Sequence, residues 1–215
     1  MPKRNITIGK SLRISKIQMV CSLLPTTKFK KMTQLFGILG NKRHGKDTIS
    51  DYLCKNYGFQ KDAFAKPLKD VCQILFGFSN EQLYGNLKET TDPFWKISPR
   101  QSMQFIGTDL IRNQFHQLIP EIGDNFWLKS LESRIKSQKT VVSDVRYQNE
   151  VDCIHKLGGK VIKVVRKDVP IDFSHTSEAL IPEIKNYDFL IENNGSLEDL
   201  YLQIEMIITQ CKVQS

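Results

Sequence analysis

The feature that most constrains the fold of this chain is a G-x-x-x-x-G-K string at residues 40–46. An apolar run at residues 35–39 precedes it, and a helical pattern at residues 47–57 follows it. In that strand–loop–helix order the string predicts a phosphate-binding loop, because glycines let backbone N–H groups surround phosphate oxygens and Lys46 adds a mobile cation. We favour this reading over a glycine-rich turn with a solvated lysine. The predicted nucleotide-binding residues of the loop are Gly40, Asn41, Lys42, Arg43, His44, Gly45, Lys46, Asp47 and Thr48.

One position of the loop departs from the usual pattern. The lysine of such loops is normally followed by Ser or Thr, whose hydroxyl ligates Mg²⁺; here Asp47 follows, with Thr48 one residue further on. On a helix Thr48 lies about 100° around from that position. Either Asp47 reaches the metal through water or Thr48 contributes from a shifted loop, and the sequence leaves the choice open. Asp144, at the end of a later apolar strand, is a third candidate ligand, in the place of a Walker-B-type carboxylate.

Short apolar runs alternate with helical patterns along the rest of the chain. Strands are expected at residues 59–64, 141–142, 161–165 and 187–191, with helices from Pro67, after Ser98, between the two valine-rich strands, and after Ser196. Ser98, Pro99 and Gln101 form a strong helix start, with a capping serine and proline in the first turn. This order predicts an α/β fold in three layers with a parallel sheet, as in P-loop NTPases.

The positive charge of the chain is concentrated at its N-terminal end. The formal net charge is +8, but residues 1–34 hold eight basic residues and no acid, so the remainder is neutral. The predicted domain, residues 35–215, therefore gives no electrostatic indication of nucleic-acid binding. Residues 1–34 are interpreted as a basic extension: a disordered arm, a targeting peptide, or the product of a start codon placed too early, before Met32.

Cysteine usage and hydropathy predict an intracellular protein. The five cysteines are scattered and never form a C-x-x-C pair, which argues against a disulfide framework or a zinc site and for a cytoplasmic location. No apolar run approaches the roughly 18–20 residues that span a bilayer, so no membrane association is expected. The basic extension leaves organelle targeting open, and the sequence leaves the oligomeric state open, a homodimer included.

Five segments together resemble the bacteriophage-type deoxynucleoside monophosphate kinases, and they occur in the order of that family. They are residues 45–48 (GKDT), 67–69 (PLK), 100–110 (RQSMQFIGTDL), 144–150 (DVRYQNE), and the stretch from HTSE at 175–178 to NGSLE at 194–198. The likeness runs from about residue 35 to the C-terminal helix. Residues 77–98 differ from the family pattern and form a shorter stretch than in the family.

The resemblance implies an enzyme that uses ATP and Mg²⁺ to convert deoxynucleoside monophosphates to diphosphates, with a nucleotide-kinase-like fold that carries acceptor-binding helices and a lid. It implies catalytic roles for Lys46, Arg146 and Arg166, and an adenine-binding loop at Asn194 and Gly195. The implied substrate-binding residues are Lys69, Arg100, Gln104, Thr108, Trp127, Asp144, Arg146 and Glu150.

The spacing of the 100–110 segment agrees with a binding face. Arg100, Gln104 and Thr108 are four residues apart, so an α-helix would place them on one polar stripe that drifts about 40° per step. Arg112 would have drifted too far to belong to it. For Trp127, packing in the core is nearly as well favoured as stacking on a base. The polar stretch from Arg166 to Lys185 resembles a flexible lid, although no arginine follows Arg166.

Other functions fit the motifs less well. A P-loop GTPase would need a guanine-reading N-K-x-D after a late strand, and the sequence contains none. Animal-type phosphomevalonate kinase shares a Gly-Lys-Asp loop, and dephospho-coenzyme A kinase shares a late Asn-x-Gly-Ser. Neither accounts for residues 100–110 and 144–150 together. A P-loop module that binds nucleotide without catalysis is a further, weaker alternative.

Overall fold

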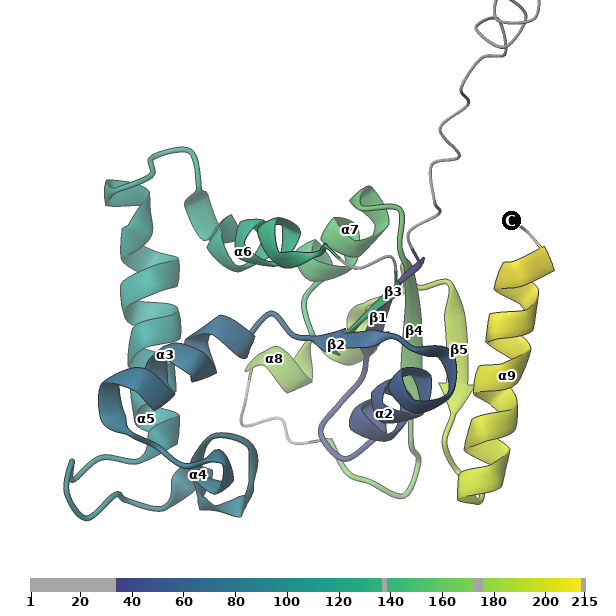
Figure 1. Cartoon of the computed structure of the whole chain (residues 1–215), viewed down its shortest axis with the longest axis horizontal. Coiled ribbons are helices and arrows are strands. Elements are labelled where there is room, and N and C mark those ends of the chain that lie inside the picture. The colour runs from purple at the N-terminus through teal and green to yellow at the C-terminus, as the bar shows by residue number, and fades with distance from the viewer. Residues whose placement is uncertain (1–33, 137–138, 172–175, 214–215) are drawn as a thin grey trace, which may run out of the picture. The chain divides into compact units, whose positions relative to one another are not determined.

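A computed structural model describes residues 34–136, 139–171 and 176–213 of the chain (Figure 1). Five parallel strands form one sheet in the order β2-β3-β1-β4-β5. The strands are β1 (Gln34–Leu39), β2 (Gln60–Asp62), β3 (Lys139–Val145), β4 (Lys160–Val165) and β5 (Phe189–Glu192). The central strand, β1, carries the phosphate loop at its carboxyl end. The strands β2 and β3 lie on one side of β1, and β4 and β5 lie on the other side, so the strand order reverses at β1. Ligands of parallel α/β sheets bind at such a switch point.

Alternation along β1 divides the core into two layers. Phe36 and Ile38 point to the face covered by α2 (Lys46–Tyr57) and α9 (Leu197–Val213). Leu35 and Leu39 point to the opposite face, which α6 (Phe126–Arg134) and α7 (Gln148–Lys156) cover. Because both faces are buried, β1 is apolar from Leu35 to Leu39 rather than alternating with polar residues. The predicted three-layer α/β P-loop fold is confirmed.

A third apolar cluster lies beside the sheet, beyond β2, in the helices that follow it (Figure 1). These elements are α3 (Lys66–Phe76), α4 (Asn80–Tyr84), η1 (Asn86–Glu89), α5 (Pro99–Gln104), η2 (Phe105–Arg112), η3 (Phe115–Gln117) and η4 (Gly123–Asn125). Cys72, Phe78 and Met103 are among its buried residues. The predicted start of α5 is confirmed: Ser98 Oγ accepts from Gln101 N at 3.2 Å, and Gln101 Oε1 accepts from Ser98 N at 2.8 Å.

The structure departs from the sequence-based expectations in two places. Residues 105–112 form a π-helix rather than a continuation of the α-helix. In addition, the second half of the stretch interpreted as a flexible lid is packed: α8 (Thr176–Ala179) is followed by η5 (Ile181–Glu183), and Ile181 and Ile184 are buried in the α6/α7 layer. Apolar side chains at these two positions anchor a segment that is otherwise polar.

The basic extension, apart from Gln34 in β1, lies outside the described residues. Cys54, Cys72 and Cys153 are free thiols. Among the described residues, no helix is both long and apolar enough to cross a membrane.

Candidate active site

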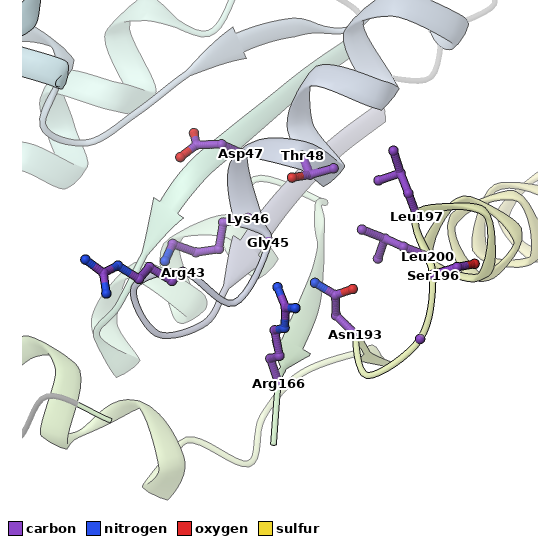
Figure 2. Close-up of a pocket in the computed structure, with 11 residues that line it drawn as sticks. Arg43, Gly45, Lys46, Asp47, Thr48, Arg166, Asn193, Ser196, Leu197 and Leu200 are labelled. Carbon is purple, nitrogen blue, oxygen red and sulfur yellow. The ribbon is translucent and has the colours of Figure 1, made fainter. Parts of the chain in front are cut away.

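Loops at the carboxyl ends of β1, β4 and β5 surround a cleft of about 420 Å³. Figure 2 shows Lys46 and Arg43 of the phosphate loop on one side, Asn193 and Leu197 on the other, and Arg166 between them. Leu200, at the start of α9, closes its apolar end. The predicted adenine-side segment thus meets the phosphate loop in one cleft.

The phosphate loop has an unusual backbone. Arg43 and Gly45 adopt positive φ angles of 66° and 107°, conformations that turn successive N–H groups toward the same concavity and favour anions. Gly40 is required for a different reason: a Cβ at this position would lie 2.7 Å from the carbonyl oxygen of Val164 in β4. The two glycines of the motif therefore have separate roles, one in packing against the sheet and one in the turn.

Lys46 is held inside the loop. Its side chain is buried, and Nζ donates to the carbonyl oxygen of Asn41 at 2.8 Å. Burial, assisted by the positive charge of Arg146, lowers the pKa of Lys46 to about 8. A bound polyphosphate would replace the lost hydration with negative charge and raise this pKa again.

The phosphate loop is braced by the loops after β4 and β5. Asn193 Nδ2 donates to the carbonyl oxygen of His44 at 3.0 Å, and Arg166 N donates to His44 Nδ1 at 3.3 Å. The side-chain oxygen of Asn194, which was predicted to contact adenine, accepts from Lys167 N at 2.8 Å. Asn193 is the asparagine that lines the cleft, together with Gly195. The side chains of Asn193 and Asn194 thus join the loop after β5 to the phosphate loop and to the loop after β4.

The two candidate metal ligands of the loop point to different sides of α2 (Figure 2). Asp47 is exposed and pairs with Lys61 Nζ at 2.9 Å; burial opposes the effect, but this pairing and the nearby Lys46 keep the pKa of Asp47 lowered. Thr48 lines the cleft on the side of Leu197. Asp47 is therefore ionised, and both Asp47 and Thr48 line the nucleotide cleft, with Thr48 on the side of Leu197.

Asp144 lies at a bulge in β3. Gly37 pairs with Val142 but Leu39 pairs with Val145, so β3 has one extra residue at 143–144. The carboxylate accepts from the backbone N–H groups of Phe64 and Ala65 at 2.7 and 3.0 Å. Burial raises the pKa of Asp144, and these two hydrogen bonds oppose the rise. Asp144 thus fixes the entry to α3, and its charge acts on both Lys46 and Lys69.

Arg146 follows β3 and is hydrogen-bonded to two acidic side chains, one through its backbone and one through its guanidinium. Glu150 Oε2 accepts from the backbone N–H groups of Arg146 and Tyr147 at 2.8 and 3.2 Å, so it caps α7. Burial and the charge of Asp144 raise the pKa of Glu150 to about 8. The guanidinium of Arg146 donates to Glu178 Oε1. In this structure Glu150 orients the backbone around Arg146 rather than facing the cleft.

The helices after β2 contribute further positive charge. Lys69 Nζ lies 4.0 Å from the centre of the Tyr84 ring, and Arg100 Nε pairs with Glu89 Oε1 at 2.9 Å. Burial and the charge of Lys88 lower the pKa of Lys69 to about 8. Burial and the charges of Arg100, Lys42 and Arg146 also lower the pKa of Lys88. Basic side chains from both sides of the site therefore converge.

The π-helix changes the predicted polar stripe. Gln104 and Thr108 are exposed, but only Arg100 and Gln104 share an α-helix, so the drift worked out for α-helical spacing does not apply to Thr108. The α-helical drift excluded Arg112 from the polar stripe. Its Cζ lies 5.2 Å from the centre of the ring of Tyr147, the residue that follows Arg146 in sequence. The sequence of residues 105–112 gives no signal that distinguishes a π-helix from an α-helix.

Trp127 belongs to the core. It is 8% exposed, and its Nε1 donates to the carbonyl oxygen of Gly107 at 3.2 Å inside the third apolar cluster. The packing alternative accounts for this residue, and the geometry gives no support to base stacking. Conversely, Lys88 and Glu178 were not among the predicted site residues. Glu178 lay in a segment that resembled the family, whereas Lys88 lay in the dissimilar stretch and had no such signal.

The parallel sheet, the phosphate loop at its central strand and the basic cleft define a P-loop kinase. The chain belongs to the deoxynucleotide monophosphate kinase family, whose sequence model matches residues 34–92 and 78–204. A protein of Acanthamoeba polyphaga mimivirus that carries this family name is 39% identical over 180 residues, covering 79% of this chain and 93% of the relative. The deoxynucleotide monophosphate kinase of Enterobacteria phage T4 is 26% identical over 242 residues, covering 80% of this chain and 97% of the phage protein.

Solved structures similar to this one include a dephospho-CoA kinase from Campylobacter jejuni, with 16% identity, a TM-score of 0.45, and coverage of 84% of this chain and 97% of that one. A gluconokinase from Sinorhizobium meliloti 1021 has 9% identity and a TM-score of 0.44, with coverage of 86% and 98%. The fold assignment rests on the sheet order and the phosphate loop, not on these scores.

Proposed function

We propose that this kinase transfers the γ-phosphoryl group of ATP to a deoxynucleoside monophosphate. The observation that carries the proposal is the meeting of two basic surfaces: Lys46 of the phosphate loop lies close enough to Arg146 for the arginine to lower its pKa. Lys69, Lys88 and Arg100 extend the positive charge toward the helices that follow β2. A site for two phosphorylated molecules requires positive charge on both sides and between them.

In the proposed reaction a phosphate oxygen of the acceptor forms the new bond to the γ-phosphorus. The bond from that phosphorus to its bridging oxygen breaks, and the electron pair leaves with ADP. Lys46, Arg146 and Arg166 would stabilise the negative charge on the transferring group, since catalysis of this step depends on positioning and charge neutralisation. Lys69 and Arg100 would hold the acceptor phosphate. Gln104 and Thr108, exposed on α5 and η2, remain proposed contacts to the acceptor.

The residues present fit a nucleotide-bound Mg²⁺. Such an ion takes one or two protein oxygens and completes its shell with phosphates and water. Within the described part of the chain no group of three or more His, Cys, Asp or Glu side chains gathers as a metal centre. Thr48 at the cleft, with Asp47 and Asp144 acting through water, would hold the ion, which supplies additional positive charge on the phosphates.

The proposal is tested with purified protein, ATP, Mg²⁺ and a panel of phosphorylated acceptors. The panel includes the common deoxynucleoside and ribonucleoside monophosphates, phosphomevalonate and dephospho-coenzyme A. Lys46→Ala should lower kcat at least about a hundredfold, the loss typical of one preorganised transition-state charge. Lys55→Ala, an exposed lysine in the last turn of the same helix, is the control. Unchanged turnover in Lys46→Ala, or phosphorylation of only the last two acceptors, would refute the proposal.

A further inference from the structure

Glu178 is a buried carboxylate that joins two parts of the site. It lies on α8 and is 2% exposed. Oε2 accepts from Lys42 N at 2.7 Å and from Asn41 Nδ2 at 3.1 Å, and the backbone oxygen of Glu178 accepts from the same Asn41 amide at 2.8 Å. Oε1 accepts from Nη1 of Arg146. One oxygen therefore serves the start of the phosphate loop and the other serves Arg146.

The charge of Glu178 is maintained by these contacts. Burial by itself would raise its pKa, but the guanidinium of Arg146 and the donors from Lys42 and Asn41 outweigh burial and keep the pKa lowered. A buried carboxylate is costly unless it is paired and hydrogen-bonded, and here both conditions are met. The side chain is thus ionised at neutral pH.

The position of Glu178 is set by packing rather than by its own helix. α8 has four residues, too few to form without tertiary support. Ile181, two residues after the end of α8, is 1% exposed and packs with the apolar side chains of α6 and α7. The core therefore fixes the carboxylate at the edge of the phosphate loop, from a segment more than 130 residues away in sequence.

We propose that Glu178 is a positioning residue that holds the Arg146 guanidinium against the phosphate loop, next to Lys46, in the geometry required for phosphoryl transfer. The inference rests on the proposed function and adds the residue through which Arg146 acts. Two cations side by side repel each other, and a carboxylate hydrogen-bonded to one of them and to the loop that carries the other offsets this repulsion. Without that charge, the guanidinium would move away from Lys46.

Replacing Glu178 with glutamine, its amide isostere, tests the positioning role directly. Three donors face the carboxylate: Lys42 N, Asn41 Nδ2 and Arg146 Nη1. Glutamine offers a single acceptor oxygen, so its NH₂ must face either the loop donors or the guanidinium. Glu178→Gln therefore breaks one connection whichever way the amide is turned, while the volume of the side chain is conserved.

The test is a double-mutant cycle measured as kcat at saturating ATP and acceptor. Glu178→Gln should lower kcat about 10- to 100-fold and change either KM less than about threefold, because the ground-state contacts of both substrates remain. In an Arg146→Ala background the same change should cost less than about threefold, since the group through which Glu178 acts is already gone. The kcat of Lys46→Ala defines the lowest activity in the set, and the kcat of every other variant must be measurably higher than this value.

The control is Glu183→Gln, which removes the same charge from an exposed position in η5 and should leave kcat unchanged. Thermal unfolding is measured for every variant; if Glu178→Gln does not unfold cooperatively, Glu178→Asp, which keeps the charge on a shorter side chain, replaces it in the cycle. The positioning role would be overturned if the losses of kcat in the two single variants multiply in the double variant, or if Glu178→Gln keeps the kcat of the wild type. A wild-type protein inactive on every monophosphate would refute the proposed function instead, so the two failures are distinguishable.

Discussion

The ionisation of Lys69 should govern how the enzyme uses its acceptor at alkaline pH. Lys69 lies on α3 with Nζ over the Tyr84 ring, and burial together with the charge of Lys88 lowers its pKa to about 8. A lysine binds a phosphate only while it is protonated. With a pKa near 8, the protonated fraction falls about tenfold between pH 7 and pH 9. We therefore expect kcat/KM for the monophosphate to fall by about the same factor.

The assay isolates this group by saturating the enzyme with ATP. Under that condition Lys46 is covered by phosphates, which raise its pKa, so the alkaline limb of kcat/KM for the acceptor reports the acceptor side. Arginine stays charged across this range. Lys69→Arg should accordingly show a loss of less than about twofold between pH 7 and pH 9, whatever its absolute activity.

The matched control is Lys66→Arg, in the first turn of the same helix. Lys66 is exposed and paired with Asp70, and this hydrogen bond raises its pKa rather than lowering it. The Lys66 variant should therefore keep the wild-type profile. If Lys69→Arg retained the full alkaline limb, another group would be responsible, and the buried environment of Lys69 would have no part in acceptor binding.

Two further predictions test other parts of the site. Arg100→Ala should raise the KM for the monophosphate at least about tenfold, the cost of one charge-assisted hydrogen bond, and leave the KM for ATP within about twofold. The control is Glu89→Gln, which removes only the charge of the partner of Arg100. An equal rise in the KM for ATP would contradict the assignment of Arg100 to the acceptor. Glu150 has its pKa raised to about 8 by burial and by Asp144, so the folded state binds this proton more tightly than the unfolded state and its contribution to stability is lost as pH rises from about 4.3 to 8. Glu150→Gln keeps an acceptor for the two backbone amides, so its Tm relative to wild type should rise by at least about 3 °C between pH 5 and pH 8, and parallel Tm curves would show that Glu150 is not the group responsible.

Local sequence signals were sufficient for the strands, for α2, α7 and α9, and for the phosphate loop. The G-x-x-x-x-G-K string combines strand, loop and helix within a few residues, so the loop conformation depends mainly on neighbours in sequence. The capping box at Ser98 and the glycine at 58 likewise fix helix ends through local hydrogen bonds and a positive φ. The alternation of apolar strands and helices was enough to predict a parallel sheet, because each buried strand needs helices on both faces.

The acceptor side depended on contacts that are distant in the sequence. The π-helix at residues 105–112 changed which side chains share a face. Trp127 packs in the third apolar cluster, where a carbonyl group 20 residues earlier accepts its indole N–H. Glu178 reaches the phosphate loop only because apolar residues after α8 pack on the far layer of the core. A sequence specifies which side chains can ionise or donate, whereas their pKa values and partners follow from burial, and burial is a property of the folded chain. The sequence therefore determined the fold and the phosphate loop, and the tertiary structure decided which charges meet at the transferring phosphate.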